Sequence, residues 1–351
     1  MHKIVFLYTE LAGYFLSCVK ELAKRKDVEV YIVRWPVNKE APFNFDFGNS
    51  VQVFNRNDYT TVALLELVDS ISPSLIYSSG WIDKGYLKIC KQYRNKIPVI
   101  VGFDNHWHGT VKQHIASLVS FKKIHPYFNH CWVPGKPQYE YALRLGFKPQ
   151  QILTGFYVAD YKLFHGFYEK YFQHKKENFP KRFIYVGRYY DFKGIQELWD
   201  AFISLDKKSP TDWELWCLGT GDIEPVIHPK IKHFGFVQPH ELEQFVSQTG
   251  VFVLPSRFEP WGVVVHEFAA AGFPLLCSKA VGANSAFLED GINGYVFEIN
   301  NASSIEKMMQ KIINKSQEEL LEMCKISASK AAGITPEKWV ESLIGVLNKN
   351  K

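Results

Sequence analysis

Short apolar runs alternate with stretches of helical periodicity along the first half of the chain. Residues 4–8 and 28–33 are continuous apolar runs, which predict buried strands, and residues 14–24 repeat apolar side chains at helical spacing. A strand, a loop, a helix and a second strand within about thirty residues are typical of a βαβ unit, whose strands are parallel. Further strands are predicted at residues 73–77, 98–103 and 129–134, and further helices at residues 61–70, 86–93, 111–123 and 137–145.

The same pattern starts again after residue 181. Residues 165–181 are polar, aromatic and rich in lysine, and we interpret them as an excursion between two domains. Beyond them, the residues from Ile195 to Ile203 carry the 3.6-residue period of a helix. Strands are predicted at residues 182–186, 213–218, 231–237, 251–255 and 275–278. A chain of 351 residues is long enough for two separate cores, so we expect two α/β domains.

Composition narrows the class of protein. Hydrophobic residues make up 46% of the chain and charged residues 22%, as in soluble globular proteins. The net charge of +5 is compatible with phosphate-bearing ligands or an anionic membrane surface, and it is too small to indicate nucleic acid as a partner.

The cysteines and the apolar runs bear on location. Six cysteines are scattered without a Cys-x-x-Cys pair, which argues against a disulfide framework or a zinc site and favours a reducing compartment. The apolar run at residues 4–8 is too short for a signal peptide, and no window of about 18 apolar residues occurs. We therefore expect a cytoplasmic protein.

Two carboxylates flank an apolar helix that follows the predicted strand at residues 251–255. Pro260 stands where a first helical residue is favoured, and the helix reads apolar almost all round before Gly272. Such a helix is buried, so Glu267 within it needs a partner. Eight helical residues rise about 12 Å, so Glu259 and Glu267 could hold two ends of one elongated ligand. Alternatively, Glu267 and the adjacent His266 form a narrow solvated stripe on a core helix.

Two loops at predicted strand ends carry candidate polar residues. Arg188 and Lys193 lie on the loop that enters the helix beginning near Ile195, and the N-terminus of a helix is an anion site. Asp104 and His106 follow the strand at residues 98–103, and ligands of open α/β sheets bind beyond the carboxyl ends of strands. The alternative for Asp104 and His106 is a capped loop with surface histidines. Two histidines here do not complete a metal site.

Glu259 and Glu267 form a Glu-x7-Glu motif after a strand, with Pro-Trp-Gly inside it and Ala-Ala-Gly-x-Pro after it at residues 270–274. This pattern resembles the donor-site signature of the retaining glycosyltransferases of family four. Those enzymes have the GT-B fold, with two Rossmann-like domains that face each other across a cleft. The resemblance implies that Glu259 contacts hydroxyls of the transferred sugar and Glu267 the ribose of the nucleotide. It also implies that Arg188 and Lys193, in a Gly-Arg…Lys-Gly motif, hold the donor diphosphate.

The resemblance extends to domain boundaries and to further binding residues. It implies a first, acceptor-binding domain over residues 1–165, a donor domain over residues 166–334, and a last helix at residues 335–351 that crosses back to the first domain. Gly13 falls where the family has a glycine-rich loop near the diphosphate, although a plain helix-start glycine explains it equally. The remaining donor-binding residues implied are Gly187, Gly219, Val237, Trp261, Gly262 and Val263.

These features predict a retaining glycosyltransferase that moves a sugar from a nucleotide-diphosphate sugar to a saccharide or lipid-linked acceptor. No Asp-x-Asp pair is present to hold a metal against the diphosphate, so Arg188, Lys193 and their helix are expected to replace it, with no cofactor. The leaving phosphate oxygen would take the acceptor proton, and Asp104 or His106 would orient the acceptor.

Three alternatives stay open from the sequence. The protein could be another GT-B sugar-nucleotide enzyme such as an epimerase, or a non-catalytic sugar-nucleotide-binding subunit of a glycosylation complex. The predicted helix at residues 111–123 is amphipathic and basic, which suits either a peripheral contact with the inner face of a membrane or a solvated core helix.

Overall fold

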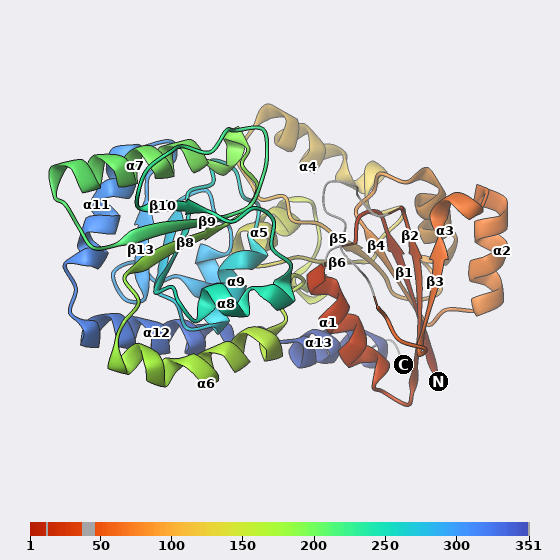
Figure 1. Ribbon diagram of the computed structural model, residues 1–351. Helices are drawn as coiled ribbons and strands as arrows, with labels where there is room; N and C mark the ends of the chain where they lie inside the picture. The colour runs from red at the N-terminus through yellow and green to blue at the C-terminus, as the bar shows by residue number, and fades with distance from the viewer. Residues whose placement is uncertain (12, 37–45, 350–351) are drawn as a thin grey trace. The chain divides into compact units, whose positions relative to one another are not determined.

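The computed structural model describes residues 1–11, 13–36 and 46–349, and the chain forms two compact α/β units (Figure 1). Unit 1 consists of Met1–Asp160 together with Ile334–Lys351, and unit 2 of Tyr161–Gly333. The prediction of two α/β domains is confirmed.

Unit 1 is built on a parallel sheet of seven strands within the described residues, in the order β3-β2-β1-β4-β5-β6-β7. Side chains of β1 alternate between the two faces, with Ile4 and Phe6 in one core and Val5 and Leu7 in the other. This alternation is the two-residue period of a strand buried on both faces. The strands are β1 (His2–Tyr8), β2 (Val28–Arg34), β3 (Val51–Asn55), β4 (Leu75–Ser79), β5 (Val99–Gly102), β6 (His130–Trp132) and β7 (Ile152–Leu153).

Helices cover both faces of this sheet. α1 (Gly13–Ala23) packs with α13 (Pro336–Lys349) on one face, and the others include α2 (Thr61–Ile71), α3 (Lys84–Tyr93), α4 (Val111–Lys123) and α5 (Lys136–Arg144). The short turns η1 (Arg56–Asp58) and η2 (Pro149–Gln151) lie between them.

The last helix returns to the first unit, as the GT-B resemblance implied. The indole N–H of Trp339 in α13 donates to the carbonyl oxygen of Phe156 at 3.1 Å, and its ring stacks on Trp132 with centroids 4.6 Å apart. Because Trp339 is buried in the core formed by β1 and α1, α13 is an integral part of unit 1.

Unit 2 repeats the architecture with a six-stranded parallel sheet in its described residues, in the order β10-β9-β8-β11-β12-β13. Its strands are β8 (Arg182–Val186), β9 (Glu214–Leu218), β10 (Ile231–His233), β11 (Val251–Leu254), β12 (Leu275–Ser278) and β13 (Gly294–Phe297). Its helices are α6 (Tyr161–Glu177), α7 (Ile195–Lys208), α8 (Glu243–Val246), α9 (Val263–Ala270), α10 (Asn284–Phe287), α11 (Ala302–Ile313) and α12 (Gln317–Ala331), with the turns η3 (Asp191–Lys193) and η4 (Pro239–Glu241).

Two expectations about local structure are wrong. The excursion expected at residues 165–181 is mostly the helix α6, because Phe164 and Phe167 are buried one helical turn apart while most of the polar residues, Lys175 excepted, are partly or fully exposed. The units divide directly before this helix, so residues 161–165 lie in unit 2 and not in the first domain. The strand expected at residues 231–237 ends at His233, since the chain turns away through Gly235 with φ of 71°.

Candidate functional site

The loop between β8 and α7 is held against the end of β11. Gly194 has φ of 67° and caps α7, and a Cβ on it would lie 2.3 Å from the carbonyl oxygen of Pro255. A side chain at this position is therefore excluded by both backbone conformation and space. Lys193 directly precedes Gly194 and therefore lies at the N-terminus of α7.

Lys193 and Glu259 meet in an ion pair. The Nζ of Lys193 lies 2.5 Å from Oε2 of Glu259, and the hydroxyl of Ser256 donates to the same oxygen at 3.2 Å. Only 16% of the lysine side chain and 12% of the glutamate side chain are exposed. The structure thus brings together two predicted site residues that are 66 positions apart in the chain.

Arg188 is exposed on the same loop. Its guanidinium lies 5.1 Å from the ring centroid of Tyr190 and 5.9 Å from that of Phe192, both distances typical of cation–π contacts. Its own carbonyl oxygen accepts a hydrogen bond from the hydroxyl of Tyr185 at 2.8 Å. The loop therefore carries two cations, one held by Glu259 and one presented toward solvent.

Arg257, which was not among the site residues predicted from the sequence, joins the two loops. Its guanidinium pairs with Asp191 at 2.6 Å and with Glu197, and its backbone N–H donates to the carbonyl oxygen of Phe192 at 2.8 Å. The hydrogen bond from Arg257 to Glu197 raises the pKa of the guanidinium, so the residue stays charged. The acidic residues beside Lys193 in the sequence were the available signal for such a partner.

The turn that carries Glu259 is pinned to the loop after β12. The backbone N–H of Gly282 donates to the carbonyl oxygen of Glu259 at 3.1 Å, and Trp261, which is buried, accepts one from Ala283 at 2.9 Å. Helix α9 starts only at Val263, after Gly262 with φ of 89°. The expectation that Pro260 begins the helix is therefore wrong, because a left-handed residue separates it from the first helical turn.

Helix α9 is buried on most sides, as its apolar sequence predicted. His266 is fully buried, stacks on Phe287 with centroids 4.3 Å apart, and places Nε2 3.2 Å from the carbonyl oxygen of Ala331. It therefore lies in the core and does not share a solvated stripe with Glu267. Glu267 itself is half-buried.

The other predicted donor residues lie at or beyond strand ends of the same sheet. Gly187 follows β8, and Gly219 follows β9 and donates its N–H to the carbonyl oxygen of Gly235 at 2.7 Å. A Cβ on Gly219 would overlap the carbonyl oxygen of Gly187, so the close approach of these two loops requires glycine. Val237 is half-buried in the loop after β10.

Unit 1 has a separate cavity of about 430 Å³ where β1, β4 and β5 end. Asp104 lines it, and Oδ2 of Asp104 accepts a hydrogen bond from Tyr157 at 3.3 Å. Glu10, which sequence analysis missed although it follows β1 closely, is a second acidic lining residue. The described lining residues are Tyr8, Thr9, Glu10, Leu11, Tyr14, Tyr77, Ser79, Gly80, Trp81, Ile82, Gly102, Phe103, Asp104, Asn105, Phe156 and Tyr157, none of them basic.

The tyrosines of this cavity are neutral hydrogen-bonding groups. Burial raises the pKa of Tyr8, Tyr14, Tyr77 and Tyr157, so their hydroxyls remain protonated. His106, on the same loop as Asp104, is half-buried against the ring of His108, with centroids 4.1 Å apart. Gly13 is the first residue of α1.

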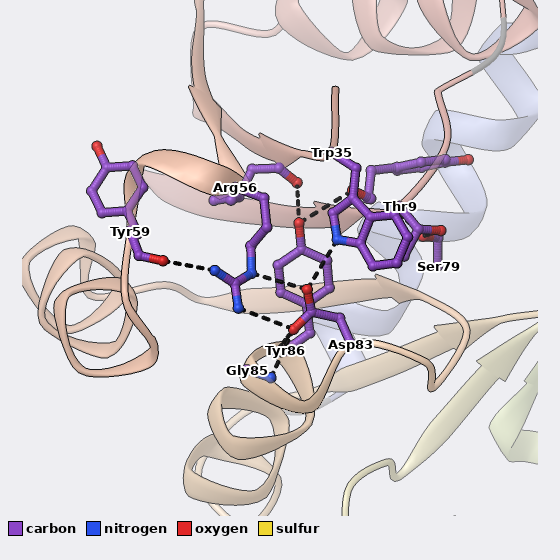
Figure 2. Close-up of polar contacts among 10 residues, drawn as sticks. Thr9, Trp35, Arg56, Tyr59, Ser79, Asp83, Gly85 and Tyr86 are labelled. Atoms are coloured by element: carbon purple, nitrogen blue, oxygen red, sulfur yellow. Dashed lines mark hydrogen bonds and ion pairs between the residues drawn. The ribbon is translucent and has the colours of Figure 1, made fainter. Parts of the chain in front are cut away.

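A partly buried polar network around Asp83 lies close to Thr9 and Ser79, two residues that line the cavity (Figure 2). Both carboxylate oxygens of Asp83 accept hydrogen bonds from Arg56, at 2.9 and 3.3 Å, and the indole of Trp35 adds another at 2.9 Å. Asp83 also caps α3 through the N–H groups of Gly85 and Tyr86. Burial alone would raise the pKa of Asp83, but these hydrogen bonds outweigh it and keep the pKa below its usual value. Residues 79–82 of the lining are thereby fixed between β4 and α3.

Comparisons with known proteins agree with this architecture of two α/β units, each built on a parallel sheet. The family described as Glycosyl transferases group 1 matches residues 168–331, within unit 2. An uncharacterised glycosyltransferase of Haemophilus influenzae is 27% identical over 180 residues, 49% of this chain and 50% of that protein. The lipopolysaccharide core biosynthesis glycosyltransferase LpsE of Rhizobium meliloti is 27% identical over 137 residues, 36% of this chain and 38% of that protein. The matches thus span half or less of these relatives.

Solved structures resemble the whole chain. Anabaena Alr3699/HepE, crystallised in complex with UDP and glucose, has a TM-score of 0.70 at 14% identity, covering 99% of this chain and 100% of that one. Sucrose-phosphate synthase from Thermosynechococcus elongatus has a TM-score of 0.73 at 16% identity, covering 99% of each chain. At these identities the likeness shows the fold, and the fold is GT-B, as the sequence predicted.

Proposed function

We propose that the protein is a glycosyltransferase that moves a sugar from a nucleotide-diphosphate sugar to a saccharide or lipid-linked acceptor, with retention of configuration and without a metal ion. The observation that carries the proposal is the Lys193–Glu259 pair at the N-terminus of α7, inside the segment that matches the glycosyltransferase family. The structures of HepE with UDP and with UDP-glucose support a uridine nucleotide as the donor.

The donor site would work by exchanging partners. Without donor, Lys193 and Glu259 neutralise each other at 2.5 Å. When the diphosphate binds at the N-terminus of α7, Lys193 and Arg188 would contact its oxygens and stabilise the charge that develops on the leaving group. Glu259 would then be free to accept hydrogen bonds from hydroxyls of the transferred sugar. Glu267 is assigned to the ribose.

In the transfer step, the bond between the anomeric carbon and the phosphate oxygen breaks and a bond to the acceptor oxygen forms on the same face. The departing phosphate oxygen takes the acceptor proton, so atoms and charge balance without a protein base. The cations Lys193 and Arg188 would replace the metal ion of metal-dependent transferases. In the described part of the chain, no three His, Cys, Asp or Glu side chains gather in a way that could hold a metal.

The cavity of unit 1 is the proposed acceptor site. Its aromatic walls suit the apolar faces of a sugar ring, and Asp104, Glu10 and the protonated tyrosines can bond hydroxyl groups. Because two acidic residues and no basic residue line it, we propose that a neutral or amino sugar binds there in preference to a phosphorylated one. Asp104 lines the cavity, which favours it over His106 as the group that orients the acceptor.

Isothermal titration with UDP, GDP, ADP and UDP-glucose tests the donor assignment. We expect UDP and UDP-glucose to bind, and Lys193→Met to weaken both. Incubation of UDP-glucose without acceptor, followed by NMR, separates the alternatives: a new sugar nucleotide would indicate an epimerase. If no nucleotide binds the folded protein, the proposal is wrong.

A cytoplasmic location remains a prediction. Among the described residues, no helix combines the length and the apolar character needed to cross a bilayer.

A further inference from the structure

Helix α4 (Val111–Lys123) presents its apolar side chains to solvent. Leu118 is 75% exposed and Val111 77% exposed, and Ile115, Val119 and Phe121 are exposed as well. Ser120 is the buried residue of this thirteen-residue helix. An exposed apolar patch on one element marks a site of interaction.

The apolar side chains share one face. Residues four and seven positions apart lie on the same side of a helix, so Val111, Ile115 and Leu118 form a stripe. Successive residues turn by about 100°, which places Ser120 on the opposite side from this stripe. α4 therefore turns a serine toward the protein and its aliphatic residues outward, the reverse of a core helix.

The inward side is held by polar contacts. The side chain of Gln113 donates to the carbonyl oxygen of His106 at 2.7 Å and accepts from the N–H of His108 at 2.7 Å. Thr110 caps the helix by accepting from the N–H of Gln113. α4 is thus attached to the loop that carries Asp104 without burying its own apolar residues.

The charges of α4 identify the surface that fits it. Lys112, Lys122 and Lys123 are exposed, and the segment from Val111 to Lys123 contains no aspartate or glutamate. Lys122 lies next to the exposed ring of Phe121, with Nζ 5.4 Å from its centroid. At about 100° per residue, Lys112 and Lys123 flank the stripe, and Lys122 lies at its C-terminal end. Lysines in these positions can extend to lipid headgroups while the stripe enters the acyl region.

We propose that α4 docks the protein on an anionic lipid bilayer, lying in the interface with Val111, Ile115, Leu118 and Phe121 inserted. A second copy of the chain fits less well, because a symmetric contact through α4 would bring its lysines together without an acidic partner on the helix. Docking would hold the loop containing Asp104 close to the membrane surface, where lipid-linked acceptors lie. The proposed docking of α4 does not depend on the proposed transferase activity.

Flotation with vesicles tests the proposal on the full chain. We expect binding to phosphatidylcholine vesicles that contain phosphatidylglycerol, weaker binding without phosphatidylglycerol, and weaker binding in high salt. Leu118→Asp should reduce partitioning at least about tenfold, since burying one leucine side chain is worth more than that factor. Val62→Asp is the matched control, because Val62 is 65% exposed on α2, away from this surface, and should bind as wild type.

Circular dichroism and thermal melts should show that Leu118→Asp folds as wild type, because the side chain has few neighbours to lose. Titration with UDP measures binding at the donor site independently of binding to vesicles. If the protein binds vesicles but not UDP, the docking of α4 is supported and only the proposed nucleotide donor is contradicted. Absent vesicle binding by wild type, or equal binding by Leu118→Asp, overturns the proposal. A dimer that Leu118→Asp converts to monomer, with no vesicle binding, would assign the surface to a second copy instead.

Discussion

The exchange of partners at Lys193 predicts opposite effects for substitutions on the two sides of the ion pair. In the unliganded protein Lys193 is engaged by Glu259 at 2.5 Å, and Glu259 also accepts from Ser256. UDP brings a diphosphate but no sugar, so it needs the lysine and gains nothing from the glutamate. Glu259→Gln keeps the shape of the side chain but releases the lysine. It should therefore bind UDP at least as tightly as wild type, whereas Lys193→Met should bind it more weakly.

The magnitude follows from the contacts that are lost or gained. One hydrogen bond to a charged group contributes about 1.5–3 kcal/mol, so Lys193→Met should lower UDP affinity about 10- to 150-fold. In the wild type, the gain from the contact between Lys193 and the diphosphate is reduced by the cost of breaking the ion pair between Lys193 and Glu259, whose side chain is only 12% exposed. Removing that competition in Glu259→Gln should strengthen UDP binding by about 1 kcal/mol, roughly fivefold.

Isothermal titration of UDP into both variants and the wild type measures these effects directly. Circular dichroism must first show that each variant is folded, because removing one partner of a buried ion pair can cost about 3–5 kcal/mol of stability. Lys208→Met is a suitable control, since Lys208 pairs with Glu306 on the surface at 2.8 Å, outside the site. Weaker UDP binding by a folded Glu259→Gln variant than by wild type would refute the exchange of partners.

Three further predictions concern stability and metal dependence. The ammonium of Lys175 is buried 3.5 Å from the ring centroid of Phe273 and has no hydrogen-bond partner among the described residues. This burial lowers the pKa of Lys175 from 10.5 to about 8. Between about pH 8 and 10.5 the unfolded chain therefore binds more protons than the folded protein, so the free energy of unfolding should rise with pH in this range. In urea unfolding, Lys175→Met should remove that rise and stabilise the protein at pH 7 by about 1–3 kcal/mol. An unchanged pH dependence in Lys175→Met would contradict this prediction. Because the pKa of Asp83 is lowered in the folded protein, its ionised carboxylate stabilises the fold above about pH 4 and loses this effect as the pH falls further. Asp83→Asn should therefore lower the free energy of unfolding by about 2–3 kcal/mol at pH 7 and by progressively less in acid. A difference between the two proteins that does not change with pH would argue against this role of Asp83. Sugar transfer should persist in excess chelator, and activity that is lost and then restored by magnesium or manganese would exclude a metal-independent reaction.

The sheets were predictable from sequence because strands of a parallel sheet are buried on both faces and read as short apolar runs. Residues 182–186 and 251–254, for example, form β8 and β11 where such runs occur. Helix α6 was misread because its apolar positions are aromatic residues set among lysines and histidines, which hides the period. Phe164 and Phe167 are buried in it all the same.

The chemistry of single loops was also predictable, whereas contacts between loops were not. Lys193 and Glu259 were each expected at strand ends. The acidic residues Asp191 and Glu197 indicate that a basic partner is needed, but the sequence does not indicate that this partner is Arg257 of the other loop. Such pairs form between residues about 60 positions apart, beyond any local pattern. The conformation of Gly262, which moves the start of α9 past Pro260, likewise depends on the loop that packs against it.

The central claim is that Glu259 acts on the transferred sugar while Glu267 holds a part of the donor that does not react. Steady-state kinetics of sugar transfer by Glu259→Gln and Glu267→Gln test it most directly. Glu259→Gln should lower kcat by roughly 10²–10³-fold, because a preorganised contact in the transition state is lost, while Glu267→Gln should mainly raise the donor KM. Normal turnover by a folded Glu259→Gln variant would contradict the account.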